Sequence, residues 1–524
     1  SRISRILKDI IKPYAIFCVD IQYKNDKHIE PFNNPLILFY DNPTDEQYKL
    51  IPKHSFNLSQ SPLIIINKGG TIEIYNGLDF SDSSNQWLDA IDIDIQLLKI
   101  ENLRNGEGWK EIYSEHFTKS KTVDRFLLSN ITDARRILIA KEPNFPEGNL
   151  TPEVANRLIG RLIFIRYLID RNVVFNGQNI LKGSDKEERQ EALNNILLDH
   201  KLTYDFFEYI SDKFGGDLFP LEFENQGFPF LERHYVQQAN LNVLHYLFTC
   251  SKMFVGEKVK GYSVQPSMFN VYDFEIIPVE LISNIYESFL GNTAFSNGVM
   301  ITKLSKQKEV KAYYTPPFLV DYVLSQTIQP FLIDKKNSSC KVLDPSCGSG
   351  IFLVESLRRI IDKEIIVSKQ DSISNERLWH LLENNIYGID IDKNAIEITI
   401  FSLYVTLLDY KSHPKEIEDF EFRPLIGKNL FGGQDADFFN EKNNFNHLFQ
   451  NEVKLDFIIG NPPWGAVKTS IYSEYIKKRS LKESNKGIKL KIGNNEISQA
   501  FMVRVSDLIQ NNSIRSRFVD KAKE

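Results

Sequence analysis

The sequence predicts an α/β fold for its carboxyl-terminal part, preceded by a helical region and by an α+β amino-terminal region. Strands and helices alternate from about residue 310 onward, which is typical of a parallel sheet with helices on both faces. Amphipathic helical patterns dominate the middle of the chain, and short β-rich runs dominate the first 120 residues. For a chain of 524 residues we expect three domains, at 1–120, 121–305 and 306–524.

Composition and charge exclude several classes of protein. Hydrophobic residues make up 42% of the chain, which is too many for a largely disordered protein. No apolar stretch reaches the roughly 20 residues of a membrane-spanning helix, and the cysteines are too few and scattered for a disulfide framework. We therefore expect a cytoplasmic protein. The net charge of −6 still allows a local basic groove for nucleic acid, because phosphate binding depends on local charge.

Local patterns support the two upstream regions. Lys68-Gly69-Gly70 lies between two apolar runs and predicts a β-hairpin. Further helices are expected at 240–254 and 278–291, and residues 175–191 form a polar connection. Another helix is expected to bury one apolar face and to carry its arginines on its other faces. The apolar residues are Leu158, Leu162, Ile165 and Ile169, and the arginines are Arg157, Arg161 and Arg166.

The first chemical motif is the turn from Asp344 to Gly350, which follows an apolar strand and leads into a helix. Glycines let the backbone approach a ligand closely, and a helix start offers free N–H groups. The turn lacks the Gly-Lys-Ser/Thr ending of a nucleotide-binding P-loop. A tight turn without a ligand remains the alternative.

The second motif is an acidic strand end, Asp390-Ile391-Asp392, about 40 residues further on. A carboxylate in this place can accept both hydroxyls of a ribose, as in dinucleotide-binding folds. The alternative is a helix cap, and Asp392 fits that role because a helical pattern follows it.

The third motif, Asn461-Pro462-Pro463-Trp464, directly follows the apolar strand 457–460. The prolines stiffen the loop, and the Asn side chain and a Pro carbonyl are acceptors for an exocyclic amine. An amine held by them loses its planarity, so its lone pair becomes available. Trp464 supplies a face on which a base can stack. A rigid structural loop is the alternative.

In this order the motifs resemble the γ-class N6-adenine DNA methyltransferases, which use S-adenosylmethionine. Tyr313-Tyr314-Thr315-Pro316-Pro317 comes first, then the Asp344 turn, Asp390, Asn429 within GKNLF, and the Asn461 loop. The resemblance covers about 310 to 510. It implies a Rossmann-like methyltransferase fold, double-stranded DNA as the partner and no metal.

The resemblance also assigns roles to single residues. The expected cofactor-binding residues are Tyr314, Thr315, Asp344, Ser346, Gly348, Gly350, Asp390, Ile391 and Asn429. Tyr314 and Thr315 would line the methionine end, Asp390 would bind the ribose, and Ile391 and Asn429 would face the adenine. The expected residues for the target adenine are Asn461, Pro462, Pro463 and Trp464.

A second resemblance concerns the upstream regions. Residues 157–175 and 272–291 look like the helical region that precedes the methyltransferase in type IIG restriction–modification enzymes and in related phage-defence methyltransferases of the DISARM or BREX kind. In type IIG enzymes a nuclease domain lies further upstream. Residues 1–120 contain no Asp/Glu-x-Lys, and Gln22-Tyr23-Lys24 is only a near miss. We therefore expect a nuclease-like domain without catalysis there.

A basic stretch follows the third motif and contains Tyr472 and Tyr475. Such stretches are often only solvated surface, but the position behind the Asn461 loop favours contact with DNA phosphates. The expected DNA-binding residues are Lys468, Lys477, Lys478, Arg479 and Lys482.

The visible strands supply four members of a sheet that has about seven in this family. Strand 457–460 would then have an unpaired edge, so we expect the late strands and the target-recognition domain to lie outside this sequence.

The leading hypothesis is a site-specific DNA adenine-N6 methyltransferase of a bacterial restriction–modification or anti-phage defence system. One alternative is a fused type IIG restriction endonuclease and methyltransferase. Another is a methyltransferase-like DNA-binding subunit that works with other subunits of a defence complex. Methylation of protein glutamine or of RNA is less favoured, because the architecture is like that of restriction enzymes.

Overall fold

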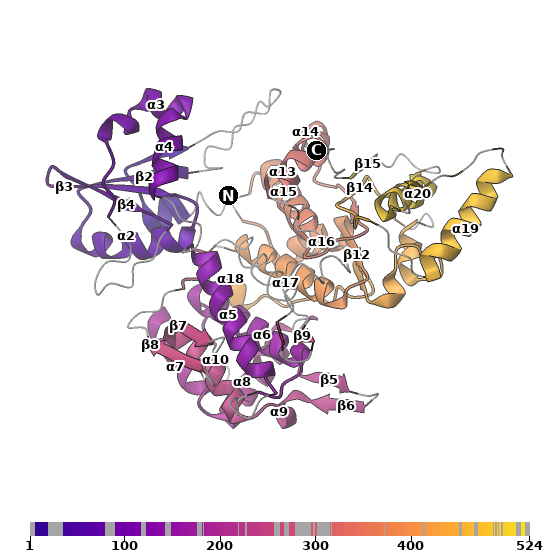
Figure 1. The fold of residues 1–524 in the computed structure, drawn as a ribbon, viewed down its shortest axis with the longest axis horizontal. Helices are drawn as coiled ribbons and strands as arrows, with labels where there is room; N and C mark the ends of the chain where they lie inside the picture. Colours follow the sequence, from indigo (N-terminus) through magenta and orange to yellow (C-terminus); the bar gives the residue numbers. More distant parts are fainter. Residues whose placement is uncertain are drawn as a thin grey trace.

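The chain is described here by a computed structural model that contains both helices and sheets (Figure 1). It describes residues 6–518 except 19–34, 79–89, 117–121, 142–147, 176–180, 182, 218–219, 226–227, 256–261, 267–271, 278–294, 297–298, 301–314, 316, 371, 412–413, 450–452, 466–469, 486, 488–489, 491, 494–495 and 510–514. Among these described residues, no helix is long and apolar enough to cross a membrane. The mixed α/β class that the sequence predicts is confirmed.

The amino-terminal region is a four-stranded sheet that carries a capped helix on its β2–β3 crossover. The strands lie in the order β1 (Ala15–Cys18), β2 (Pro35–Asp41), β3 (Leu63–Lys68) and β4 (Thr71–Asn76). Only β2 and β3 are parallel, and α2 (Asp45–Leu58) connects them. Gly69 and Gly70 join β3 to β4 with φ angles of 60° and 90°, so the predicted hairpin is confirmed.

Short helical segments precede and follow this sheet along the chain. They are η1 (Ile6–Ile11), η2 (Ile95–Leu98), α3 (Ile100–Asn105) and α4 (Glu107–His116). The nuclease-like character of this region and the expected domain boundaries stay predictions.

The middle region is mostly helical, as expected, but it also contains two β-hairpins. The helices are α5 (Val123–Ile139), α6 (Pro152–Asp170), α7 (Lys186–Ile196), α8 (His200–Phe214), α9 (Glu232–Tyr235) and α10 (Gln238–Thr249). The hairpins are β5 (Glu222–Asn225) with β6 (Phe228–Leu231), and β7 (Cys250–Val255) with β8 (Tyr262–Pro266). A two-residue pair, β9 (Phe295–Ser296) and β10 (Val299–Met300), follows.

Three predictions for this region are wrong or fall on residues that are not described. The helix predicted at 240–254 ends at Thr249, because the following residues pair with β8 as strand β7. Residues 175–191 are not a connection throughout, since α7 begins at Lys186 behind the capping Asp185. The helix predicted at 278–291 falls on residues that are not described.

Helix α6 is buried on all sides, which contradicts the prediction of a single buried face. Its arginines are buried with acidic partners instead of facing water. Arg161 pairs with Glu232 at 2.6 Å, and Arg166 pairs with Asp170 at 2.9 Å. Burial of these guanidinium groups is tolerated because each has a carboxylate within hydrogen-bond distance.

The carboxyl-terminal region contains a parallel five-stranded sheet. Its strands lie in the order β13 (Leu430–Gly432), β12 (Ile386–Asp390), β11 (Val342–Asp344), β14 (Phe457–Gly460) and β15 (Arg515–Phe518). The first strand of the region therefore lies in the middle, and the chain leaves it toward both sides. Strand β15 pairs with β14 along its whole length, so the expectation of an unpaired edge at strand 457–460 is wrong.

Helices cover both faces of this sheet. They are α13 (Pro317–Ser325), α14 (Ile328–Asp334), α15 (Ile351–Ser368), α16 (Asn375–Asn385), α17 (Lys393–Asp409), α18 (Pro414–Glu418), α19 (Ser470–Ser484) and α20 (Ile497–Ile509). Two short 3-10 turns, η3 (Gln434–Ala436) and η4 (Asn444–Phe449), lie between β13 and β14. The predicted alternation of strands and helices is confirmed from β11 onward.

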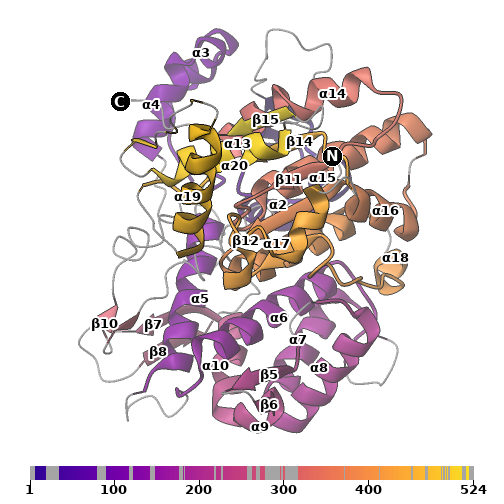
Figure 2. The same ribbon diagram turned by 90° about the vertical axis from the view of Figure 1, so that its right-hand side faces the viewer.

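Alternate residues of each strand enter two different cores. Val342, Ile386 and Phe457 pack in the core that contains α15 and α17, and this core continues into the helical region. Leu343 and Ile458 point the other way, toward Phe439, Tyr472 and Phe501 on and beside α19 and α20. Figure 2 shows α17 between the sheet and α6, where Phe401 and Phe164 meet edge to face at 6.4 Å.

A buried ionic cluster joins α6 to the end of α17. Asp409 accepts a hydrogen bond from Tyr167 at 2.9 Å and another from Arg358 at 3.0 Å. Arg171 lies 3.5 Å from the same carboxylate and donates to the carbonyl oxygens of Leu408 and Lys411. The helical region and the parallel sheet are therefore fixed to each other by charge as well as by apolar packing.

Replacing Asp409 with Ala should strongly destabilise this junction. The substitution removes the carboxylate beside the buried Arg171 guanidinium and one of the carboxylates beside the half-buried Arg358, which typically costs about 3–5 kcal/mol. Thermal unfolding followed by circular dichroism should show a clearly lower midpoint. Asp419→Ala, at an exposed position after α18, is the control and should unfold like the wild type. Equal midpoints for both variants would contradict a structural role for the cluster.

Candidate active site

Parallel pairing brings the predicted motifs to one edge of the sheet. Strand β11 lies between β12 and β14, with Asp344 beside Gly388 and Leu343 beside Ile458. Because all three strands run the same way, their carboxyl ends meet, and these ends carry Asp344, Asp390 and the Asn461 loop. Ligands of open parallel sheets bind at such a point, where the strand order reverses.

The turn after β11 is held by its own aspartate and by two glycines. Asp344 is buried and accepts a hydrogen bond from the backbone N–H of Ser346 at 3.0 Å. Gly348 and Gly350 have φ angles of 54° and 81°, which favour glycine. A Cβ atom at Gly350 would also lie 2.7 Å from Thr399 of α17. The glycines therefore let the turn close tightly against α17.

Asp390 joins this turn to the neighbouring strand. Its carboxylate accepts from the backbone N–H of Gly348 and from that of Asp392, both at 2.8 Å. Ile391 next to it is 45% exposed. Asp392 caps α17 by accepting from the N–H of Asn394, which confirms the cap interpretation for that residue.

The Asn461 loop lies against the same turn. The Ser346 hydroxyl donates to the carbonyl oxygen of Asn461 at 3.3 Å, although the two residues are 115 positions apart. Gly460 permits this approach, because a Cβ atom there would lie 2.4 Å from the Asp344 carboxylate. The Asn461 side chain donates to the Thr315 hydroxyl at 3.0 Å and accepts from the Trp464 indole at 2.9 Å.

The start of α20 supports the far end of this loop. The N–H of Gly465 donates to the Glu496 carboxylate, and the N–H of Ile497 donates to the carbonyl oxygen of Gly465 at 3.0 Å. Glu496 is not among the residues that the sequence motifs predict for the site. Its position just before a helical pattern could have indicated a cap, but no local pattern indicates a contact with Gly465.

Asn429 does not lie at the cofactor site that the family resemblance implies for it. The residue precedes β13 and is buried at the amino ends of the strands. Its side-chain amide donates to the carbonyl oxygens of Glu383 and Ile386, at 2.9 and 2.8 Å. Asp390 lies at the other end of β12, four residues beyond Ile386 and thus about 13 Å from it at about 3.3 Å per residue. Asn429 therefore connects α16 to the sheet and does not reach the Asp390 site.

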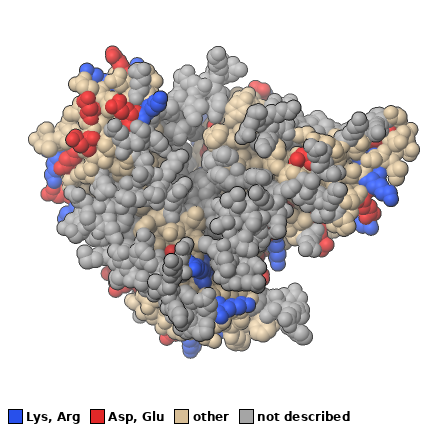
Figure 3. All heavy atoms as spheres, viewed as in Figure 1, with Lys and Arg blue, Asp and Glu red and all other residues tan. Residues whose placement is uncertain are grey.

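The basic stretch divides into exposed and buried residues. Lys477, Lys478 and Lys482 are exposed on α19, and Lys478 pairs with Glu441. Arg479 is buried and pairs with Glu483, so the expected phosphate contact does not fit its placement. Figure 3 shows basic and acidic side chains side by side over the protruding end of the molecule where α19 lies in Figure 1.

The two tyrosines of this stretch are core residues and not stacking platforms. Tyr472 and Tyr475 are buried against Phe439, with ring centroids 5.2 and 5.5 Å away. Tyr314 and Lys468 from the predicted site fall on residues that are not described.

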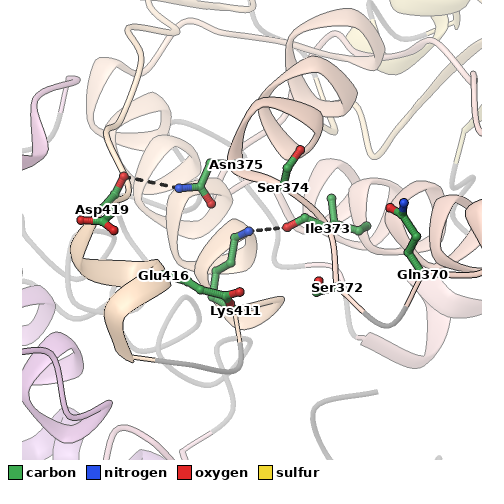
Figure 4. Close-up of a pocket in the computed structure, with 8 residues that line it drawn as sticks. All are labelled: Gln370, Ser372, Ile373, Ser374, Asn375, Lys411, Glu416 and Asp419. Atoms are coloured by element: carbon green, nitrogen blue, oxygen red, sulfur yellow. Dashed lines mark hydrogen bonds between the residues drawn. The ribbon is translucent and has the colours of Figure 1, made fainter.

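A further hollow lies apart from this edge. A polar hollow surrounds Lys411, just past the end of α17, and the Lys411 ammonium donates to the carbonyl oxygen of Ile373 (Figure 4). It lies at the end of α17 opposite Asp392, so it is separate from the motif residues. No group of three or more His, Cys, Asp and Glu in the described part of the chain is arranged to hold a metal.

Burial dominates the electrostatics at Asp344. Loss of hydration raises the pKa of this carboxyl from 3.8 to about 8, and the nearby Asp390 charge adds to the effect. The hydrogen bond from the Ser346 N–H acts in the opposite direction and is the weaker influence. A proton on Asp344 is therefore favoured near neutral pH.

Part of the region that contains these motifs matches a known protein family. Residues 384–518 match the family described as Eco57I restriction-modification methylase. The chain carries an Eco57I-type restriction-modification methylase domain. The matched residues include Asp390, the Asn461 loop and α19, whereas the Asp344 turn lies before them.

Curated relatives agree with this assignment. The type II restriction enzyme and methyltransferase RM.Eco57I of Escherichia coli is 23% identical over 412 residues, which cover 71% of this chain and 37% of that protein. The type II methyltransferase M.BstVI of Geobacillus stearothermophilus is 32% identical, covering 32% of this chain and 26% of that protein. The adenine-specific methyltransferase PglX of Streptomyces coelicolor is 24% identical, covering 29% and 14%. The chain thus spans about a third or less of these relatives.

The raised pKa of Asp344 predicts a pH-dependent stability for the ligand-free methylase domain. Between about pH 4 and 8 the folded chain keeps a proton on Asp344 that the unfolded chain loses. The free energy of unfolding therefore falls as the pH rises through this range, by at most about 1.4 kcal/mol per pH unit. Asp344→Asn lacks this ionisation, so its melting temperature should rise relative to the wild type from pH 5 to pH 8.

Melting curves of both proteins at matched ionic strength test this dependence. Asp392→Asn, at the exposed cap of α17, controls for the general effect of losing a carboxylate from the same edge. A melting-temperature difference between Asp344→Asn and the wild type that stays constant with pH would contradict the prediction.

Proposed function

We propose that this protein transfers a methyl group from S-adenosylmethionine to the exocyclic N6 of an adenine in double-stranded DNA. It would serve a bacterial restriction–modification or anti-phage defence system in the cytoplasm. The observation that carries the proposal is the meeting of the Asn461 loop, the Asp344 turn and Asp390 at one sheet edge. The names of the relatives support both the reaction and its biological setting.

The sheet supports a Rossmann-like methyltransferase arrangement. Its strands are parallel, the first lies in the centre, and helices pack on both faces. Such folds bind a nucleoside ligand at the carboxyl ends of the central strands, which here are β11, β12 and β14.

The residues at this edge fit S-adenosylmethionine. Asp390 is a carboxylate at the carboxyl end of β12, where such folds bind ribose hydroxyls, and the exposed side chain of Ile391 can cover one face of the adenine ring. The tight turn from Ser346 to Gly350 allows close approach of the amino-acid part, and Thr315 lies beside Asn461. When bound, the cofactor supplies an electrophilic methyl group on a positively charged sulfur. Asn429 is left out of this set because it lies at the opposite edge.

The chain's own residues would prepare the target adenine for attack. The side-chain oxygen of Asn461 and the carbonyl oxygen of Pro462 accept from the N6 amine, which draws its lone pair out of conjugation with the ring. Pro463 stiffens the loop, and Trp464 stacks on the flipped base. The amine prepared in this way would be the nucleophile for the methyl group that the cofactor supplies, and the proton that it loses would pass to water.

DNA contacts are proposed for the exposed face of α19. Lys477, Lys478 and Lys482 lie on the helix that follows the Asn461 loop, and Lys468 precedes it in the chain. The family match falls on the methylase region alone, which is why methyl transfer and not cleavage is proposed.

Asp390→Ala should weaken S-adenosylmethionine binding, because it removes charge-assisted hydrogen bonds worth roughly 1–3 kcal/mol each. Isothermal titration calorimetry with the full chain should show an affinity at least about ten-fold lower. Asp392→Ala is the matched control, since it removes a carboxylate two residues away that caps α17. Undiminished affinity in Asp390→Ala would rule out the assigned ribose site.

Asn461→Ala should abolish methylation while S-adenosylmethionine still binds. The lost acceptor acts mainly on the reacting amine, and loss of one such group typically slows a reaction by about 100-fold or more. Transfer of tritiated methyl groups to plasmid DNA from a methylation-deficient host measures the rate, and nucleoside mass spectrometry identifies N6-methyladenine. Asn384→Ala, at an exposed position on α16, should keep the wild-type rate. A wild-type rate in Asn461→Ala would refute the mechanism.

A further inference from the structure

The Asn461 side chain is oriented by groups on both sides of its amide. We infer that Thr315 is the positioning residue that anchors the amide of Asn461 beside Trp464, the side on which the target base stacks. This inference rests on the proposed function, because it assigns Thr315 a role in preparing the target amine. It also changes the role that the family resemblance implies for Thr315, which is to line the methionine end of the cofactor.

The hydrogen-bond chemistry fixes which amide atom faces which partner. The indole Nε1–H of Trp464 can only donate, so the atom 2.9 Å from it must be the amide oxygen, Oδ1. The amide nitrogen, Nδ2, then faces the Thr315 hydroxyl at 3.0 Å and donates to it. The orientation of the amide therefore follows from the Trp464 indole, which can only donate. The shape of the Asn side chain alone does not distinguish its oxygen from its nitrogen.

Thr315 is well placed to anchor the Asn461 amide. Its side chain is 6% exposed, and it lies just before α13. Its β-branched side chain has few rotamers, so the hydroxyl position is well defined. The main chain of Asn461 is fixed separately, because its carbonyl oxygen accepts from the Ser346 hydroxyl at 3.3 Å. The backbone of Asn461 is thus held by Ser346 in the turn after β11, and its side-chain amide is held by Thr315 and Trp464.

The two amide contacts differ in what happens to them when a base enters. Trp464 must present a ring face to the base, so its indole N–H has to share or leave the Asn461 oxygen. The Thr315 contact lies on the other end of the amide and can persist. A flipped amide would place its N–H groups against the N6 amine, so two donors would face each other. The Thr315 hydroxyl can accept or donate, so it anchors the amide, while Trp464 and then the amine itself select the orientation with the oxygen toward the base.

Three variants separate this role from a cofactor contact or a packing role. Thr315→Val keeps the side-chain shape but cannot accept from Nδ2, and Thr315→Ser restores the hydroxyl. Thr327→Val is the matched control, because Thr327 is 7% exposed and its hydroxyl donates only to the carbonyl oxygen of Val323. For each full-length variant, kcat is measured with tritiated S-adenosylmethionine and plasmid DNA, and cofactor affinity is measured by calorimetry.

The expected kinetic result is a selective loss of turnover. Thr315→Val should lower kcat about ten-fold, the effect of one ordinary hydrogen bond, with cofactor affinity within about two-fold of the wild type. Thr315→Ser should recover most of kcat, and Thr327→Val should behave as the wild type. A weakened cofactor affinity with kcat retained in Thr315→Val would overturn the inference, as would equal losses in the Val and Ser variants.

A readout without turnover tests the same contacts if the wild type methylates no DNA. The chain has four tryptophans, and the indole signal of Trp464 in a ¹⁵N–¹H spectrum is assigned by its loss in Trp464→Phe. Thr315→Val should shift or broaden this signal, because the amide loses one of its two anchors, and Thr315→Ser should leave it in place. An unchanged signal in Thr315→Val would overturn the positioning role whatever the reaction is.

Discussion

The central position of β11 in the parallel sheet is the constraint on which the candidate site depends. The chain leaves this strand toward β12 on one side and returns to β14 on the other, so the three carboxyl ends form one edge. Residues more than a hundred positions apart, such as Ser346 and Asn461, then lie within hydrogen-bond distance. Without this strand order the three motifs would remain separate turns, each with an ordinary structural explanation.

The sheet is in turn supported by the helical region upstream. The core on one face continues through α17 into α6, and Asp409 ties the end of α17 to Arg171 and Tyr167. The stacked rings of Tyr404 and Phe422, 4.3 Å apart, lie in the same core. The opposite face is closed by α19 and α20, which follow the Asn461 loop. The Asn461 loop is thereby held between two packed layers and can keep its geometry.

Where the sequence predictions fail, tertiary pairing has overridden local pattern. Arg479 looks like part of a basic surface run, but its carboxylate partner Glu483 lies one helical turn away and the pair is buried. The arginines of α6 look like a solvated face, but Glu232 neutralises Arg161 from 71 positions away. Asn429 matches a motif by its spacing, yet the register of β13 places it at the wrong end of the strand.

The sequence by itself determined the strand–helix alternation, the β3–β4 hairpin and the residues Asp344, Asp390 and Asn461, because each depends on local periodicity or on a turn that few residue types allow. Only the tertiary structure decided which of these turns meet, that β15 pairs with β14, and that Thr315 and Glu496 support the Asn461 loop. Those contacts join segments distant in the chain, and their partners are set by strand order and burial, which no local pattern encodes.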